Sequence, residues 1–261
     1  MVYSCDGSNS KTLCGINVLE KKSKEINVYW SPASFTLDEE SWNMLYSDPK
    51  SIVNDIYSKR NLEAKHRSFL SCPAFKDKLK NVFMFNNTFD SEYHYENEIV
   101  ESVGQSSVGL YSQRSKSITD GPLLTYNMSW LFFAEESVDC LFTSPYFHKT
   151  EYTSSGALVP GQFDIGCWFR PFNLEIQMYN EKGNIRFNKN EPLFYIDIQT
   201  DKKINFIRFN MNKKIYNLSQ ESVQSPQRYK KFLSLNDRYS VFKNSKMKEI
   251  ILNEIKKEIV Y

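Results

Sequence analysis

Histidine is scarce in this chain, with only three residues in 261. They are His66, His94 and His148, and their separations are far from the short spacings that bring two imidazoles onto one metal ion. Glycine and proline are also sparse, at nine residues each. No glycine-rich phosphate loop, dinucleotide fingerprint, nucleophile elbow or kinase motif occurs. The sequence therefore predicts no bound metal, no cofactor and no catalytic residue of these classes.

Cysteine is limited to five scattered residues with no C-x-x-C pair. The polar start, MVYSCDGSNSKT, lacks the apolar stretch of a secretion signal. No apolar run reaches the length of about 18 residues that a membrane-spanning helix needs. These absences favour a cytoplasmic protein with reduced thiols and no membrane partner.

Charge of either sign is nearly balanced, with 33 basic and 31 acidic side chains and a net charge of +2. Such a balance gives no strong signal for nucleic acid as the partner. Aromatic residues, by contrast, make up 15% of the chain, and Phe (19) and Tyr (16) are the main contributors. This composition favours β-sheets with packed aromatic faces and argues against disorder.

The clearest pattern lies in residues 156–211, where apolar residues recur with period two. Leu174, Ile176 and Met178 alternate with more polar neighbours, which is typical of a strand with one buried face. Residues 193–198 are almost wholly apolar, as in a strand covered on both faces. Turn-forming segments separate the strands at 180–184, 188–192 and 200–203. We interpret the region as a β-meander of short strands, the pattern of a sandwich or open barrel.

Further elements are expected on both sides of this region. A short strand at 26–30 precedes a helix with Thr36 as N-cap and Glu39 completing a capping box. Two more helical stretches begin near Pro49 and at Ser71-Cys72-Pro73. Strands are predicted at 82–85, 108–111, 123–133 and 138–143, and residues 86–107 are expected to include a long loop.

The C-terminal part shows helical periodicity after Ser225-Pro226. Apolar residues recur at steps of three and four, at Phe232, Leu235, Tyr239, Phe242, Met247, Ile250, Ile251 and Ile255. This stripe either docks on the sheet or binds a partner.

The predicted architecture is a single α+β domain. It is a mainly antiparallel β-sandwich or cupin-like roll with N-terminal helices and a C-terminal helical segment. Residues 1–25 form an N-terminal extension and 26–261 the domain, with a β core at about 82–215 and C-terminal helices at about 226–259.

The densest polar and aromatic cluster lies in residues 160–171. Asp164, Trp168 and Arg170 are evenly spaced, so an extended chain would place them on one face. A carboxylate, an indole and a guanidinium together would suit a planar or anionic small-molecule ligand, and His148 is a further candidate for this site. The alternative is an Arg170–Asp164 ion pair that packs on Trp168 and serves only the fold.

Several segments together resemble an uncharacterised protein family of T4-like phages that infect marine bacteria. The segments are Asn27–Pro32, the region of Trp42 and Leu45-Tyr46, Val159–Pro171, Glu191–Tyr195, Arg238-Tyr239 and Ser245–Met247. The segment from Trp168 to Ile198 also resembles a bacterial domain of unknown function with a W-x-P…F-x-x-G-E-P pattern, although Asn190 replaces the glycine.

The resemblance and the missing catalytic motifs lead to one functional hypothesis. The chain is expected to be a non-enzymatic viral protein, either a particle component or an accessory protein that binds a host factor. Its partner would be a protein, a second copy or a host molecule, in the host cytoplasm or the virion. The alternative is a small-molecule enzyme or ligand-binding protein of cupin-like form.

Overall fold

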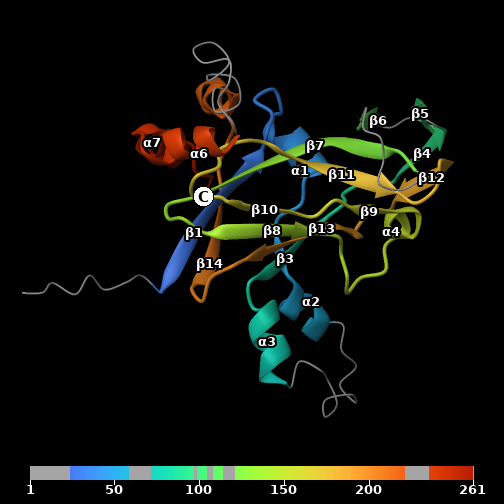
Figure 1. Ribbon diagram of the computed structural model, residues 1–261, viewed down its shortest axis with the longest axis horizontal. Helices are drawn as coiled ribbons and strands as arrows, with labels where there is room; N and C mark the ends of the chain where they lie inside the picture. Colours follow the sequence, from blue (N-terminus) through green and yellow to red (C-terminus); the bar gives the residue numbers. More distant parts are fainter. Residues whose placement is uncertain are drawn as a thin grey trace, which may run out of the picture.

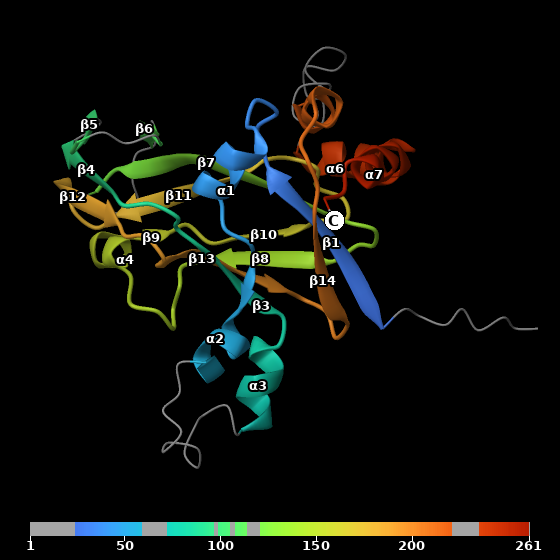
Figure 2. The ribbon, with the colours of Figure 1, turned by 180° about the vertical axis from the view of Figure 1, so that it is seen from behind.

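The computed structural model describes residues 24–58, 72–96, 99–104, 108–113, 121–220 and 235–260. These residues form an α+β fold in which two main β-sheets pack face to face and a small third sheet lies at one end (Figure 1). Helices α6 and α7 lie on one side of the sandwich and α2 and α3 on the other, as the reverse view also shows (Figure 2). The expected α+β class with mainly antiparallel strands is confirmed.

The first sheet has the strand order β14-β1-β7-β11-β9, and β6 pairs with β7 at one end. Its one parallel pair is β1 with β14, and the other pairs are antiparallel. The strands are β14 (Lys203–Arg208), β1 (Glu25–Pro32), β7 (Leu123–Ala134), β11 (Phe172–Met178), β9 (Gly156–Leu158) and β6 (Leu110–Gln113).

The second sheet has the order β10-β8-β13-β3-β2, and the third has the order β12-β4-β5. All the pairs in both sheets are antiparallel. The strands of the second sheet are β10 (Gly161–Asp164), β8 (Asp139–Thr143), β13 (Pro192–Ile198), β3 (Val82–Asn86) and β2 (Lys50–Ser51). Those of the third are β12 (Lys182–Phe187), β4 (Ser91–Glu96) and β5 (Ile99–Ser102).

The main core lies between the two large sheets and follows the period of two along each strand. In β7, Tyr126, Trp130 and Phe132 face this core, whereas Leu131 and Phe133 face the opposite side. All seven residues of β13 are buried, as the apolar run at 193–198 predicts for a strand covered on both faces. The third sheet adds its inner tyrosines and apolar residues to the same core.

Short helices cover the outer faces of both large sheets. Ile251 and Ile255 of α7 pack with Tyr29 and Phe133 on the first sheet, so this part of the C-terminal apolar stripe docks on the sheet. Residues of α2 and α3 pack on Val82, Met84 and Tyr195 of the second sheet. The helices are α1 (Glu39–Leu45), α2 (Ile52–Ser58), α3 (Pro73–Leu79), α4 (Glu151–Ser155), α6 (Leu235–Lys243) and α7 (Met247–Lys257), and residues 213–220 are also helical. No helix in the described ranges is long and apolar enough to cross a bilayer.

The meander interpretation is wrong, although its strands exist. β11 pairs with β7 and β9, β12 with β4, β13 with β3 and β8, and β14 with β1. Strands that follow one another in the sequence therefore belong to different sheets: β11 and β14 to the first, β12 to the third and β13 to the second. Period two reports which face of a strand is buried and carries no information about its neighbour.

Three local expectations also need correction. Asp38, not Thr36, is the N-cap of α1, because its Oδ1 accepts the N–H of Ser41 at 2.8 Å. Residues 86–107 contain β4 and β5 in place of a long loop. The β core begins at β1, well before residue 82, because β1 lies inside the first sheet. The expected helix start at Ser225-Pro226, and most of the predicted N-terminal extension, lie outside the described residues.

Gly183 and Asn190 differ in the backbone conformations that they adopt. Gly183 lies within β12, pairs with Tyr95 and has a φ of 159°, close to the extended conformation of a strand. The hairpin that residues 180–184 were expected to close does not form, because β11 pairs with β7 and β9 and β12 pairs with β4. Asn190 has a φ of 68°, in the left-handed region that asparagine tolerates better than most residues.

Candidate functional site

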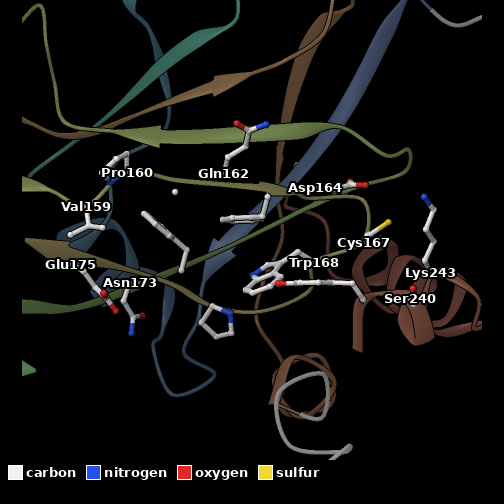
Figure 3. Close-up of a pocket in the computed structure, with 15 residues that line it drawn as sticks. Val159, Pro160, Gln162, Asp164, Cys167, Trp168, Asn173, Glu175, Ser240 and Lys243 are labelled. Atoms are coloured by element: carbon white, nitrogen blue, oxygen red, sulfur yellow. The ribbon is translucent and has the colours of Figure 1, made fainter. Parts of the chain in front are cut away.

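A groove of about 670 Å³ opens at the corner where the chain passes from the first sheet to the second. Val159 and Pro160 carry the chain across, from β9 at the edge of the first sheet to β10 at the edge of the second. Strand β11 forms a second wall, and α6 closes one end (Figure 3). The lining residues are Val159–Asp164, Cys167, Trp168, Pro171–Asn173, Glu175, Tyr239, Ser240 and Lys243.

A tight turn after β10 shapes this groove. Asp164 Oδ1 accepts the N–H groups of Val138 (3.0 Å) and Gly166 (2.8 Å), and its Oδ2 accepts the Ser137 hydroxyl. Burial alone would raise the pKa of Asp164, but these hydrogen bonds outweigh it and hold the pKa below the ordinary value. The backbone C=O of Asp164 also accepts the N–H of Trp168 at 2.8 Å. Asp164 is therefore fully engaged in holding the turn.

Gly166 is required at the centre of the turn. A Cβ built at this position would lie 2.2 Å from the backbone oxygen of Glu136, which is much closer than atoms can approach. Glycine thus allows the turn to pack against the segment between β7 and β8. The consequence is that the chain reverses between Asp164 and Trp168, and the extended stretch that the even spacing assumed does not form.

Aromatic rings form the floor of the groove. The ring of Trp168 lies 5.3 Å from that of Phe163 and 4.5 Å from that of Tyr239, measured between centroids. Phe163 in turn stacks on the core residue Phe142 at 4.9 Å. Burial raises the pKa of the Tyr239 hydroxyl, which has no hydrogen-bond partner among the described residues. The floor is therefore continuous with the sandwich core and apolar in character.

One wall of the groove is the outer edge of β10, which pairs with no other strand in the described part of the chain. Ile165 donates its N–H to the C=O of Val138 at 3.0 Å, which fixes the hydrogen-bonding phase of β10 against β8. Along a strand, the backbone N–H and C=O groups of successive residues point to opposite edges. Gly161 and Phe163 therefore bond to β8, whereas the N–H and C=O of Gln162 point away from β8. β10 is the terminal strand of its sheet, so Gln162 presents these groups at the outer edge. Its side chain is also exposed.

Charged side chains stand at the two ends of the groove. Glu175 of β11 lies at one end and Lys243 of α6 at the other, as Figure 3 shows. Neither makes an ion pair with any described residue. Within the described part of the chain neither charge is neutralised, so both side chains are candidates to bind a ligand or a partner.

The structure brings three of the four predicted site residues together. Asp164 and Trp168 line the groove, and the Arg170 guanidinium carbon lies 4.9 Å from the centroid of the Trp168 ring. The alternative of an Arg170–Asp164 ion pair does not form, because the Asp164 carboxylate accepts Ser137, Val138 and Gly166 instead.

Cys167 also lines the groove. Burial raises the pKa of its thiol, and its hydrogen bond to Asp164 raises it further. The side chain is therefore a neutral thiol, as expected for a structural cysteine.

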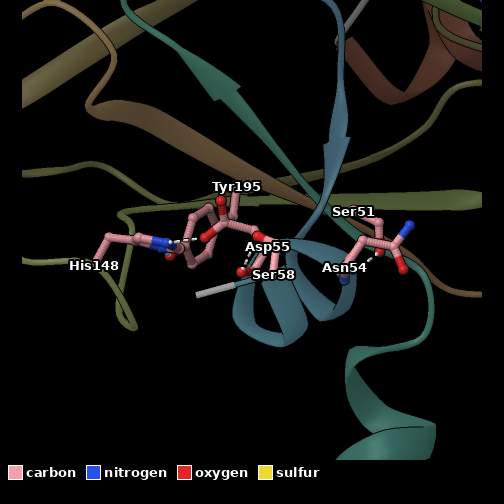
Figure 4. Close-up of polar contacts among 6 residues, drawn as sticks. All are labelled: Ser51, Asn54, Asp55, Ser58, His148 and Tyr195. Carbon is pink, nitrogen blue, oxygen red and sulfur yellow. Dashed lines mark hydrogen bonds and ion pairs between the residues drawn. The ribbon is translucent and has the colours of Figure 1, made fainter. Parts of the chain in front are cut away.

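His148 lies elsewhere, on the outer face of the second sheet. Its Nε2 lies 2.8 Å from Asp55 Oδ2 of α2, and its Nδ1 bonds to the Tyr195 hydroxyl of β13 (Figure 4). Because a carboxylate only accepts, Nε2 donates to Asp55, and in neutral His148 the Nδ1 accepts the Tyr195 O–H. The side chains of His148 and Asp55 are only 15% and 16% exposed. The chain Asp55–His148–Tyr195 thus ties α2 to the sheet, apart from the groove.

Several groove residues escaped prediction. Tyr239, Ser240 and Lys243 come from α6, more than sixty residues from the rest of the site, and no sequence spacing connects them to β10. Tyr239 stood out only as one member of the C-terminal apolar stripe. Gln162 was not predicted as a site residue, because its role depends on the position of β10 at a sheet edge.

The described residues contain no cluster of three or more His, Cys, Asp and Glu side chains arranged to hold a metal ion. No family model, no curated protein and no solved structure matches this chain. Its site must therefore be interpreted from its own geometry.

Proposed function

We propose that this chain is a non-enzymatic binding protein whose groove holds an extended segment of a protein partner. The observation that carries the proposal is the outer edge of β10, which forms one wall of a groove with an aromatic floor. An extended segment can bond to such an edge through its backbone while its side chains enter the groove. Backbone pairing supplies affinity, and the side-chain contacts supply selectivity.

The groove has the two features that this binding mode needs. Gln162 offers one N–H and one C=O, enough for the two hydrogen bonds that an antiparallel neighbour exchanges with it. Phe163, Trp168 and Tyr239 offer a preformed apolar surface, and buried aromatic anchors dominate the energetics of many interfaces. An unprotected strand edge is a hazard for aggregation unless a partner or a covering segment uses it.

The biological setting that we propose is viral. The support is the resemblance of several segments to an uncharacterised family of T4-like phages, together with a sequence that lacks catalytic motifs. The protein would be a particle component or an accessory protein that binds a host factor, in the host cytoplasm or the virion. Mass spectrometry of purified virions separates these two roles, because only a particle component copurifies in a fixed ratio to the capsid protein.

A peptide library tests the binding mode directly. Random peptides of about twelve residues are selected on the wild-type protein, and the enriched sequences are measured against two variants. Gln162→Pro removes the outward N–H and leaves the β8 ladder intact, because this N–H does not bond to β8. Gln162→Ala removes the side chain and keeps the N–H.

We expect binding to fall at least about tenfold in Gln162→Pro, since a hydrogen bond at a desolvated edge is lost, and to change less than about threefold in Gln162→Ala. Circular dichroism and thermal melting confirm that both variants fold. Equal binding by the two variants, or a library without enriched sequences, would contradict the proposal.

A small planar or anionic ligand is the second candidate. Its specific support is the volume of about 670 Å³, which lies in the range of small-molecule sites, and the Arg170 guanidinium stacked on Trp168. This ligand would contact Trp168 and Arg170 and would not need the Gln162 N–H. Binding that Arg170→Ala abolishes and Gln162→Pro spares would favour the second candidate.

A further inference from the structure

The two ends of the groove differ in charge, and this difference bears on the partner's sequence. At the α6 end, Lys243 lines the groove and makes no ion pair with a described residue. Arg170 stacks on Trp168 near the same end. Lys248 of α7 is also near this end of the groove. Together with Lys243 it lowers the pKa of the Cys167 thiol, opposing the increase that burial causes.

The acidic groups at the groove are not equivalent. Asp164 lies at the basic end, but Ser137, Val138 and Gly166 donate hydrogen bonds to both of its oxygens. Glu175 lies at the opposite end and forms no ion pair with a described residue. A partner therefore meets cations at the α6 end and one available carboxylate at the other.

The direction of β10 determines the order in which the partner's sequence meets the two charged ends of the groove. β10 runs from Gly161 to Asp164, that is, from the Glu175 end towards the α6 end. Antiparallel pairing is slightly more stable per residue than parallel pairing, and it satisfies both groups of Gln162 with one partner residue. A segment that pairs in this way begins at the α6 end and finishes near Glu175.

We infer that the partner segment carries, from N- to C-terminus, an acidic side chain, an aromatic or large apolar side chain, and a basic side chain. The acidic group would lie opposite Lys243, the apolar group on the floor formed by Phe163, Trp168 and Tyr239, and the basic group opposite Glu175. At about 3.3 Å per residue on both strands, the four residues of β10 correspond to a partner segment of about four residues. This inference rests on the proposed function and specifies its partner.

Two capped synthetic peptides of identical composition test the order. One carries glutamate, a central phenylalanine and lysine in the N-to-C order given above, and the other has glutamate and lysine exchanged. Affinities are measured by fluorescence anisotropy at low and high salt. We expect the first peptide to bind the wild-type protein about tenfold more tightly at low salt, with a smaller preference at high salt, because ion pairs at a groove rim are weak and screened.

Lys243→Glu provides the decisive variant, and we expect it to abolish or invert the preference. Lys189→Glu is the matched control, since Lys189 is an exposed lysine in the turn between β12 and β13 and the substitution makes the same change in net charge. An inversion in Lys243→Glu but not in Lys189→Glu supports the inference.

Equal binding of the two peptides, unaffected by Lys243→Glu, overturns the inference. If that binding still depends on the Gln162 N–H, the proposed edge pairing stands without the charge order. Absence of binding by either peptide also overturns the inference. The proposed function then fails only if the random library yields no sequence that distinguishes Gln162→Pro from Gln162→Ala.

Discussion

The two outer sides of the sandwich are closed in different ways. On the second sheet, α2 covers Tyr195, and Asp55, His148 and Tyr195 bond to one another across three segments of the chain. On the side of α6, the helix leaves a groove in which Gln162 presents its backbone and Lys243 remains without an ion pair among the described residues. The polar groups of the first side bond within the molecule, whereas at the groove the outer backbone groups of Gln162 and the side chain of Lys243 lack such a partner among the described residues.

Because of this difference, substitutions at the two places should have different effects, on stability at the first and on binding at the second. A buried polar group that loses its partner costs the free energy of its desolvation, whereas an exposed group that already faces water loses little. Substitutions in the Asp55–His148–Tyr195 chain should therefore change the free energy of unfolding. Substitutions of the free groove residues should change only the affinity for a partner.

The largest expected effect is at His148. His148→Ala removes both bonds of the side chain and leaves Asp55 and Tyr195 without their shared partner. We expect a loss of about 2–4 kcal/mol in the free energy of unfolding, measured by urea denaturation. His94→Ala is the matched control, because the bond of His94 to Asn184 is exposed and its loss should cost less than about 0.5 kcal/mol. Equal effects of the two substitutions would show that the covered side is not a closed network.

Substitutions of Asp164 and Arg170, both near the turn beneath the groove, should differ in their cost to the free energy of unfolding. Asp164→Ala leaves the N–H groups of Val138 and Gly166 without their acceptor, and we expect a cost of about 1–3 kcal/mol. Among the described residues, Arg170→Ala removes a stacking contact with Trp168, and we expect a cost of about 0.5–1 kcal/mol. Urea denaturation of both variants provides the comparison. A cost for Arg170→Ala equal to that of Asp164→Ala would restore the interpretation of the two residues as an ion pair.

Acid should weaken the same turn. The pKa of Asp164 in the folded protein lies below its ordinary value, because the hydrogen bonds to its carboxylate outweigh burial. Its stabilising contribution is therefore complete above about pH 4 and is lost as the pH falls through the lower folded-state pKa. We expect the difference in unfolding free energy between wild type and Asp164→Asn to shrink between pH 6 and pH 3. The exposed residue Asp201 supplies the control, Asp201→Asn, for which the difference should stay near zero.

A further small effect is expected at the turn before β13. Asn190 has a φ of 68°, so Asn190→Ala places a Cβ-bearing residue without asparagine's local hydrogen bonds in the left-handed region. We expect a cost of about 1 kcal/mol for Asn190→Ala and less than about 0.5 kcal/mol for Asn190→Gly. Thermal melting of the two variants measures the difference. A destabilisation by glycine as large as that by alanine would point to a contact of the Asn190 side chain in place of its backbone.

The sequence predicted individual elements well where the pattern was local. Leu174, Ile176 and Met178 are buried on one face of β11, and the apolar run in β13 is buried on both. Pro73 does stand in the first turn of α3. The N-cap of α1 was misplaced by two residues, because Thr36 and Asp38 both suit a cap and only the path of the chain selects Asp38.

The site was predicted only in part for the same reason. Asp164, Trp168 and Arg170 lie in one short stretch, so their proximity followed from the sequence even though the assumed extended backbone was wrong. His148 was assigned to this site without a local constraint, and it lies with Asp55 and Tyr195 instead.

Local sequence patterns were enough to predict the α+β class, most of the strands and the apolar face of each predicted element, but not β4 and β5. These properties depend on side-chain periodicity and turn chemistry within a few residues. The tertiary structure alone decided which strands are neighbours and that β10 ends its sheet opposite β11 and α6. Every strand carries the same backbone donors and acceptors, so pairing is selected by the packing of the whole core, and the groove exists only where that packing leaves an edge unpaired.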